Sequence, residues 1–102
     1  MKVTPTALPG CLVFEPKVFG DDRGCFYESW NRAAFSGQGL SPVFVQGNVS
    51  SSVRGVLRGL HYQWPNPQAK YVSVLEGEVY DVAVDIRRGS PTFGRSTSLI
   101  LS

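Results

Sequence analysis

The sequence is poor in histidine, cysteine and charge. Its single histidine, His61, excludes a metal centre built on several imidazoles. Its two cysteines, Cys11 and Cys25, provide no disulfide framework, so we expect reduced thiols. Charged residues make up 18% of the chain, and a net charge of +2 without a clustered basic stripe does not indicate a nucleic-acid partner.

Long apolar runs are also lacking. No segment approaches the roughly 18 apolar residues of a membrane span, so no membrane partner is expected. No apolar stretch follows Lys2, as it would in a secretory signal, and we expect a cytoplasmic protein. The 102 residues are enough for one domain, and the hydrophobic content of 42% is enough for a packed core.

Turn-forming residues are abundant, with 11 glycines and 7 prolines, which favours short strands over long helices. A short helix is predicted at residues 31–35, closed by Ser36 and Gly37, and a turn at residues 21–24. The strands expected from alternating apolar residues number about seven, which predicts an all-β sandwich or barrel. They are residues 11–19, 25–30, 42–53, 56–63, 70–75, 78–87 and 95–101.

Two further expectations follow from this strand pattern. Residues 70–75 and 78–87 are predicted to form a hairpin, with Gly77 in the turn. The chain ends at Ser102 directly after a predicted strand, without a terminal turn or polar tail. We therefore expect residues 1–102 to be one domain that is truncated before its last strands.

Gln46 and Asn48 lie two positions apart on a predicted strand, so their amides point to the same side. They form either a hydrogen-bonding wall for a polar ligand or a solvent-facing strand surface. Lys70 begins another predicted strand, and is either a cation turned towards an apolar face or an amine in water at the strand mouth.

Arg58 and His61 lie three positions apart, which would place them on opposite faces of a regular strand. A bulge at Gly59 would bring both to one face. His61 is then either a general base beside a cation or a structural residue. One of Asp81 and Asp85 could orient the imidazole, although solvated carboxylates are the simpler expectation.

Two more expectations concern the aromatic residues and metal ions. The aromatic side chains are expected to be mostly core. They are Phe19, Phe26, Tyr27, Trp30, Tyr62 and Trp64. Metal-binding cupin barrels use a His-x-His pair with a later glutamate and histidine, whereas here Gln63 stands two residues after His61 and no later histidine exists. We therefore predict no metal site.

Five motifs occur in a fixed order along nearly the whole chain. They are residues 19–28, 46–50, 58–63 with 68–70, 77–87, and 90–94. Together they resemble the dTDP-4-dehydrorhamnose 3,5-epimerase family. The resemblance implies a cupin-type jelly roll, a homodimer, and an isomerase of dTDP-rhamnose biosynthesis that needs no metal or cofactor.

The resemblance also implies roles for individual residues. His61 would remove a proton next to the 4-keto group of dTDP-4-dehydro-6-deoxyglucose, inverting C3 and C5, and Lys70 would stabilise the enolate. Arg23 and Glu28 would contact the nucleotide, reaching across a dimer. The remaining contacts to sugar and phosphates would come from Gln46, Gly47, Asn48, Arg58 and Lys70.

Family members are nearly twice as long as this chain. The tyrosine that acts as the opposing acid and the aspartate that partners the histidine lie in the other half. Tyr62, Tyr71 and Tyr80 do not match that tyrosine's context.

Two alternatives remain: a 3-epimerase of the same family, and a sugar-nucleotide-binding cupin without activity. A pure binder needs cations for phosphate but no base, so the combination of His61, Arg58 and Lys70 argues against the second alternative.

Overall fold

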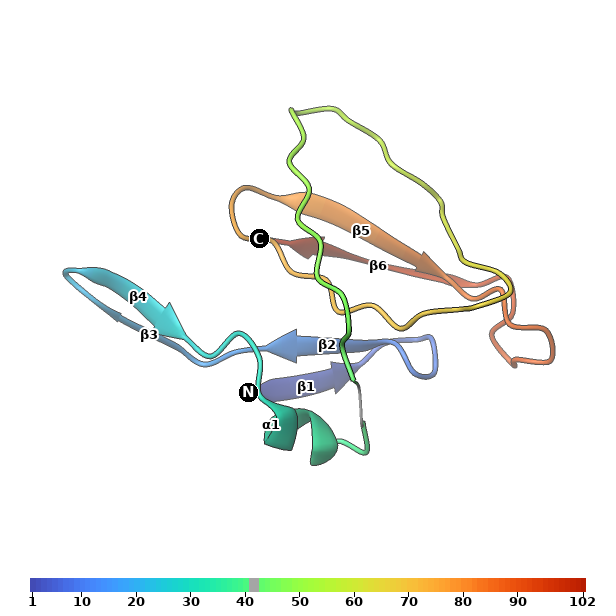
Figure 1. Ribbon diagram of the computed structural model, residues 1–102, viewed down its shortest axis with the longest axis horizontal. Helices are drawn as coiled ribbons and strands as arrows, with labels where there is room; N and C mark the ends of the chain where they lie inside the picture. Colours follow the sequence, from blue (N-terminus) through green and yellow to red (C-terminus); the bar gives the residue numbers. More distant parts are fainter. Residues whose placement is uncertain (41–42) are drawn as a thin grey trace.

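The computed structural model describes residues 1–40 and 43–102. Within them the chain forms three antiparallel hairpins and one short helix (Figure 1). The elements in chain order are β1 (Lys2–Pro5), β2 (Leu12–Glu15), β3 (Val18–Asp21), β4 (Gly24–Tyr27), α1 (Arg32–Ser36), β5 (Val79–Val84) and β6 (Ser96–Leu101). The hairpins are β1–β2, β3–β4 and β5–β6.

The turn predicted at residues 21–24 connects β3 to β4. The carboxylate of Asp21 accepts a hydrogen bond from the backbone N–H of Arg23 at 2.9 Å, which is the local bond that favours aspartate in turns. Gly24 follows with φ +132, a conformation that residues with a Cβ rarely adopt. This prediction is confirmed, and the single strand expected at residues 11–19 is divided into β2 and the start of β3.

The predicted helix is confirmed as α1. Asn31 is its N-cap, and its side-chain oxygen accepts a hydrogen bond from the backbone N–H of Ala34 at 3.2 Å. Gly37 closes the helix by donating its backbone N–H to the carbonyl of Ala33 at 2.9 Å. The helix carries Phe35, one of the two buried apolar side chains in the described part of the chain.

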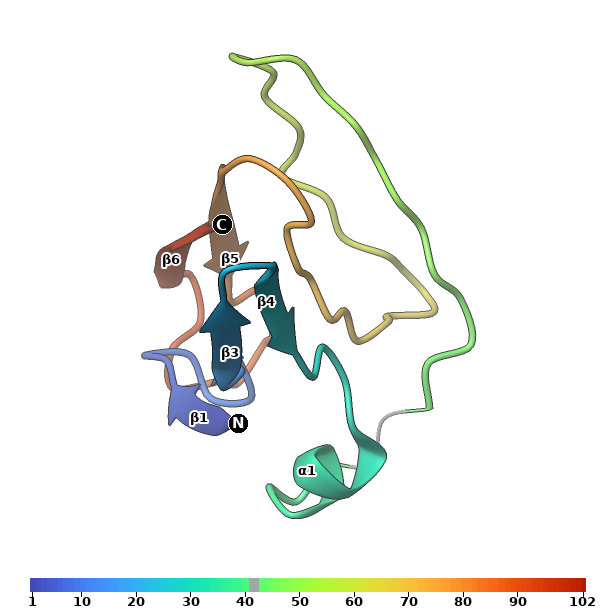
Figure 2. The ribbon, with the colours of Figure 1, turned by 90° about the vertical axis from the view of Figure 1, so that its left-hand side faces the viewer.

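Residues 43–78 form no strand, although three strands were predicted there. The predictions for 56–63 and 70–75 are wrong, as is the described part of 42–53, whereas Pro42 itself lies outside the described residues. Figures 1 and 2 show this segment as a long excursion outside the hairpins. Alternating apolar residues favour an extended backbone, but a strand also needs a neighbouring edge, and no described segment supplies one here.

The hairpin predicted from residues 70–75 and 78–87 is likewise wrong. β5 pairs instead with β6, in a register that sets Val79 opposite Leu101 and Val84 opposite Ser96. The hairpin therefore comes from the two segments on either side of residues 85–95.

The aromatic side chains expected in the core are exposed. Phe26 is 72% and Trp64 is 82% exposed, and Phe19, Tyr27, Trp30 and Tyr62 are exposed as well. These residues lie in β3–β4, next to it, or on the excursion of residues 43–78, and no second layer of the described chain covers either region. The prediction assumed a closed barrel, which the described residues do not complete.

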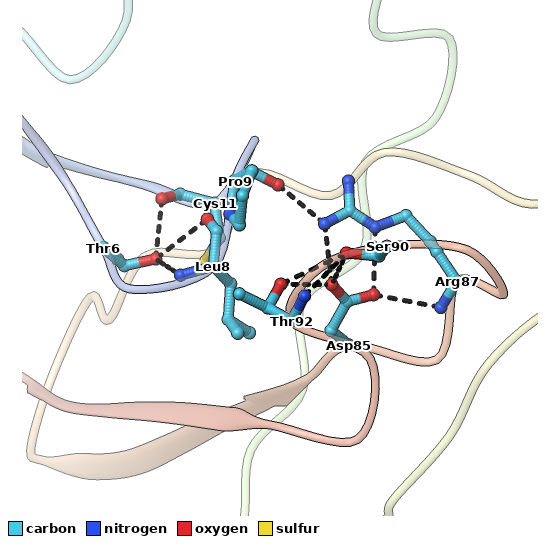
Figure 3. Close-up of polar contacts among 8 residues, drawn as sticks. All are labelled: Thr6, Leu8, Pro9, Cys11, Asp85, Arg87, Ser90 and Thr92. Atoms are coloured by element: carbon cyan, nitrogen blue, oxygen red, sulfur yellow. Dashed lines mark hydrogen bonds and ion pairs between the residues drawn. The ribbon is translucent and has the colours of Figure 1, made fainter.

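Asp85 is buried, at 4% exposure, which corrects the expectation that it is solvated, whereas Asp81 is exposed as expected. The carboxylate of Asp85 accepts five hydrogen bonds (Figure 3). Three come from the backbone N–H, Nε and Nη2 of Arg87, at 2.9 to 3.0 Å, and two from the hydroxyls of Ser90 and Thr92, each at 2.6 Å. Every donor lies within seven residues of the aspartate.

Arg87 extends this network to the N-terminal hairpin. Its Nη2 also donates to the backbone carbonyl of Pro9 at 2.9 Å, across 78 positions of sequence (Figure 3). The hydrogen bonds from Arg87, followed by those from Ser90 and Thr92, hold the pKa of the Asp85 carboxyl well below its usual range. The network thus joins the connection between β5 and β6 to the connection between β1 and β2.

Replacing this carboxylate should reduce stability in a pH-dependent way. Because the pKa of Asp85 is lowered by folding, its contribution is fully present above the unfolded pKa of about 3.9 and is lost as the pH falls below it. We expect Asp85→Asn to lower the melting temperature at pH 7, with a difference from wild type that shrinks between about pH 4 and pH 2.

Thermal melting of the whole polypeptide across this pH range measures the effect. Asp21→Asn is the matched control, because Asp21 also pairs with an arginine two residues along but is solvent-exposed. A difference for Asp85→Asn that is no larger than that of the control, or that stays constant with pH, would contradict the role assigned to the network.

Candidate functional site

The only imidazole of the chain lies on the excursion, two residues after a glycine with an unusual backbone. Gly59 has φ +104, and a Cβ added there would lie 3.5 Å from the backbone nitrogen of His61 and 3.8 Å from its Nδ1. The bulge expected at Gly59 is absent because the segment is not a strand. A glycine is nevertheless favoured, since this φ is strained for any other residue.

Arg58 is oriented by its own loop. Its Nε and Nη2 donate to the Oγ of Ser52 at 3.1 and 2.9 Å. A backbone hydrogen bond from Val56 to Val53, at 3.4 Å, closes the chain between them. No carboxylate pairs with Arg58 within the described residues. The loop therefore holds the guanidinium in place without neutralising its charge.

Gln46 and Asn48 point to the same side, as predicted from their spacing. The amide nitrogen of Gln46 donates to the side-chain oxygen of Asn48 at 3.3 Å, and both side chains are exposed. Gly47 lies between them, and a Cβ at this position would meet no atom within 4 Å. The pair therefore presents amide donors and acceptors on an open surface.

Arg23 and Glu28 each bind a neighbour in sequence. The guanidinium of Arg23 forms an exposed ion pair with Asp21, which raises the pKa of the arginine and lowers that of the aspartate. Glu28 accepts a hydrogen bond from the side chain of Asn31 at 3.0 Å. Arg23 stands in the turn of the β3–β4 hairpin, which projects from the rest of the molecule (Figure 1).

Lys70 and His61 are exposed, and neither has a side-chain hydrogen bond or ion pair to another described residue. The predicted site residues between Gln46 and Lys70 thus share one segment. No described side-chain contact joins the imidazole of His61 to Arg58 or Lys70. Two surface hollows lie away from all of these side chains. One, of about 460 Å³, is lined by residues 1–2 and 15–17, and the other, of about 270 Å³, lies between residues 8–11 and 83–87.

Metal ligands and membrane spans were also sought in the described residues. In the 100 described positions, no three histidine, cysteine or acidic side chains gather as a metal site would require. Likewise, α1 is too short to cross a bilayer, and residues 1–40 and 43–102 contain no longer helix.

One contact near the site was not anticipated from the sequence. The hydroxyl of Tyr71 donates to the backbone carbonyl of Ser29 at 2.8 Å, across 42 positions. Sequence reasoning considered Tyr71 only as a candidate acid. Its position directly after Lys70 was the available signal, but its partner cannot be inferred from local spacing.

Solved structures with the same chain path are epimerases. The chain matches a dTDP-6-deoxy-D-glucose-3,5-epimerase of Legionella pneumophila, in complex with dTDP-4-keto-L-rhamnose, with a TM-score of 0.93 and 52% identity over 99% of this chain and 54% of that one. It matches a dTDP-4-dehydrorhamnose 3,5-epimerase of Bacillus anthracis, with TDP and pyrophosphate bound, with a TM-score of 0.92 and 45% identity over 99% of this chain and 59% of that one. The fold is therefore the predicted all-β, cupin-type fold.

Sequence comparison gives the same result. The family model described as dTDP-4-dehydrorhamnose 3,5-epimerase matches residues 5–102. The dTDP-4-dehydrorhamnose 3,5-epimerase of Pseudomonas aeruginosa is 60% identical over 96 residues, which cover 93% of this chain and 53% of the relative. The chain belongs to the dTDP-4-dehydrorhamnose 3,5-epimerase family, and it spans about half the length of the curated relatives it matches.

Proposed function

We propose that this chain is the N-terminal part of an isomerase that inverts C3 and C5 of dTDP-4-dehydro-6-deoxyglucose. The product is dTDP-4-dehydrorhamnose, in dTDP-rhamnose biosynthesis. The observation that carries the proposal is that the only imidazole shares one segment with Arg58 and Lys70, within the family's motifs. Neither cation has a carboxylate partner in the described chain. Relatives with a bound dTDP-sugar or TDP support the substrate class.

The chemistry fits these residue types. A hydrogen beside a ketone is a weak acid until the charge that develops on the oxygen is neutralised. In this proposal His61 removes that proton as general base, while Lys70, assisted by Arg58, stabilises the enolate. One cationic donor in a dry site contributes about 3–4 kcal/mol to such stabilisation. A proton returned to the opposite face then inverts the centre, so the reaction requires neither a metal nor a redox cofactor.

Substrate binding is assigned to the polar groups around this centre. The amides of Gln46 and Asn48, with the backbone at Gly47, would hold the sugar. Arg58 would also bind the diphosphate, and Lys70 would contact the keto oxygen of the sugar. The negative phosphates would supply the charge partner that Arg58 lacks among the described residues. Arg23 and Glu28 are assigned to the nucleotide.

We also propose that residues 1–102 belong to one cupin-like domain whose further strands pair with residues 43–78. Two observations support this proposal: the segment belongs to no sheet, and Leu57 on it is 92% exposed. The relatives are about twice as long, so a whole protein of their length would have enough residues for such strands.

A cytoplasmic location is also proposed, because the two unpaired thiols of this chain, Cys11 and Cys25, fit a reducing compartment.

A homodimer is proposed on the basis of the β3–β4 hairpin. All eight residues of these strands are exposed, and a lone two-stranded hairpin is only marginally stable in water. A second copy packed on this hairpin would cover its aromatic side chains. It would also allow Arg23 to reach the neighbouring site.

Removing an aromatic side chain from this hairpin should weaken the dimer. We expect Phe26→Ser to shift the whole polypeptide towards monomer in sedimentation equilibrium, because Phe26 is the most exposed aromatic of the hairpin. Phe93→Ser, an exposed phenylalanine outside β3–β4, is the control and should leave the mass unchanged. A dimer equally resistant to both substitutions would rule out this interface.

Loss of the base should abolish turnover. We expect His61→Asn to lower the rate of deuterium uptake from solvent into the sugar by about 10²–10⁴, because general-base catalysis typically contributes that much. Binding of dTDP should remain. Gln63→Asn, on the same segment, is the control with near-normal uptake.

The same assay separates the alternatives. Uptake at C3 alone in the wild-type protein would identify a 3-epimerase. No uptake, with dTDP still bound, would identify a sugar-nucleotide-binding cupin without activity. Near-normal uptake by His61→Asn would remove His61 from the mechanism.

Lys70 should act mainly in the transition state. We expect Lys70→Met to lower kcat while the Kd for dTDP changes little, because an interaction with the enolate is absent from the bound nucleotide. Lys2→Met, which removes an exposed lysine paired with Glu15, is the control and should change neither quantity. Weaker dTDP binding at unchanged kcat would make Lys70 a phosphate ligand instead.

A further inference from the structure

Five aromatic side chains from distant parts of the chain form one cluster, which we call the Phe35 cluster. Phe35, at 2% exposure, is its centre. Phe14 stacks on it with ring centroids 4.3 Å apart, and Tyr71 meets it edge-on at 5.2 Å. Trp30 lies at 6.1 Å and Phe44 at 6.4 Å. These distances are those of favourable aromatic pairs, so the cluster holds its segments together.

The cluster lies next to three of the proposed site segments in sequence. Tyr71 directly follows Lys70, Trp30 comes two residues after Glu28, and Phe44 comes two residues before Gln46. Tyr71 contacts Phe44 as well, at 6.1 Å between ring centroids. The backbone carrying each of these site residues is therefore anchored within two residues of its functional side chain.

Tyr71 adds a polar link to this packing. Two side-chain hydrogen bonds join described residues more than ten positions apart, and one is the 2.8 Å bond from the Tyr71 hydroxyl to the carbonyl of Ser29. Partial burial, assisted by nearby Tyr27, raises the pKa of Tyr71, so the hydroxyl keeps its proton as a donor at neutral pH. Ser29 is the residue after Glu28, so the bond joins the backbones next to Lys70 and Glu28.

We propose that Tyr71 is a positioning residue, whose ring on Phe35 and hydroxyl on the Ser29 carbonyl fix the backbone from which Lys70 projects. The inference rests on the proposed function, because Tyr71 would act by positioning Lys70. Phenylalanine would keep the ring contacts and lose only the hydrogen bond. The Lys70 segment would then be free to shift relative to the Glu28 segment.

Tyr71→Phe is the test, with Tyr80→Phe as the matched control. Tyr80 is exposed on β5, and its hydroxyl bonds no described residue. We expect Tyr71→Phe to lower kcat of the whole polypeptide about tenfold, since small displacements of a catalytic group cost up to about a hundredfold. The melting temperature and the Kd for dTDP should match those of the control.

A double-mutant cycle identifies the route of the effect. If Tyr71 acts through Lys70, Tyr71→Phe added to Lys70→Met should cause no further loss of kcat. Multiplicative losses, or an unchanged kcat in Tyr71→Phe, would overturn the inference while leaving the proposed function intact. A wild-type protein without epimerase activity would overturn the proposed function.

Amide chemical shifts provide a readout that needs no activity. Tyr71→Phe should displace the backbone resonances of Glu28 and Lys70 together, whereas Tyr80→Phe should displace neither. Unchanged resonances at both positions in Tyr71→Phe would overturn the positioning role whatever the protein catalyses.

Discussion

The hydrogen-bond network around the Asp85 carboxylate is the constraint that joins the β5–β6 hairpin to the β1–β2 hairpin. A buried charge is costly unless its oxygens are saturated with donors, and Arg87, Ser90 and Thr92 supply them. Backbone bonds between Asp85 and both Gly94 and Arg95, at 2.7 and 2.9 Å, close the same connection. The network makes the long connection between β5 and β6 rigid enough to act as an anchor. Through Arg87 and Pro9 that anchor extends to the opposite end of the sequence (Figure 3).

The Phe35 cluster is a second anchor, and it is apolar. Together the two anchors fix the chain at Phe44, at Tyr71 and at Asp85, directly after β5. Residues 45–69, which lie between Phe44 and Tyr71, are all exposed. Gln46 and Lys70 lie close to the Phe35 cluster in sequence, whereas Arg58 and His61 lie midway. Arg58 is oriented by Ser52, and His61 has no side-chain hydrogen bond to a described residue. In the proposal that further strands pair with residues 43–78, those strands would fix the positions of Arg58 and His61.

Features set by a few neighbouring residues were predictable from the sequence. Asp21 with Gly24 specifies a turn, Asn31 with Gly37 specifies a short helix, and β5 and β6 follow from alternating apolar residues. Strand pairing was not predictable, because the alternating pattern of residues 70–75 is compatible with any available edge and β5 took β6 instead. β1 was missed altogether.

For the site, the order of the motifs predicts which residues are functional, and a period of two placed Gln46 and Asn48 on one side. Contacts across long sequence distances could not be read from it. The bonds from Tyr71 to Ser29 and from Arg87 to Pro9 span 42 and 78 positions. The burial of Asp85 had a local signal in the hydroxyls at Ser90 and Thr92, but alternation along β5 indicated solvent.

Arg58 and Lys70, two cations of the proposed site, differ from Arg87 and Arg23 in their charge partners. Arg87 is held by Asp85, and Arg23 is held by Asp21. Arg58 and Lys70 have no carboxylate partner in the described chain, although Arg58 is oriented by the Ser52 hydroxyl. A carboxylate beside either cation would offset the field that a diphosphate or an enolate requires. This field is strongly reduced in water, and His61, Arg58 and Lys70 all face solvent here. The chemistry proposed for them therefore depends on a second wall that excludes water from residues 46–70, and the exposed apolar side chains of the same segment are the surface on which such a wall would pack.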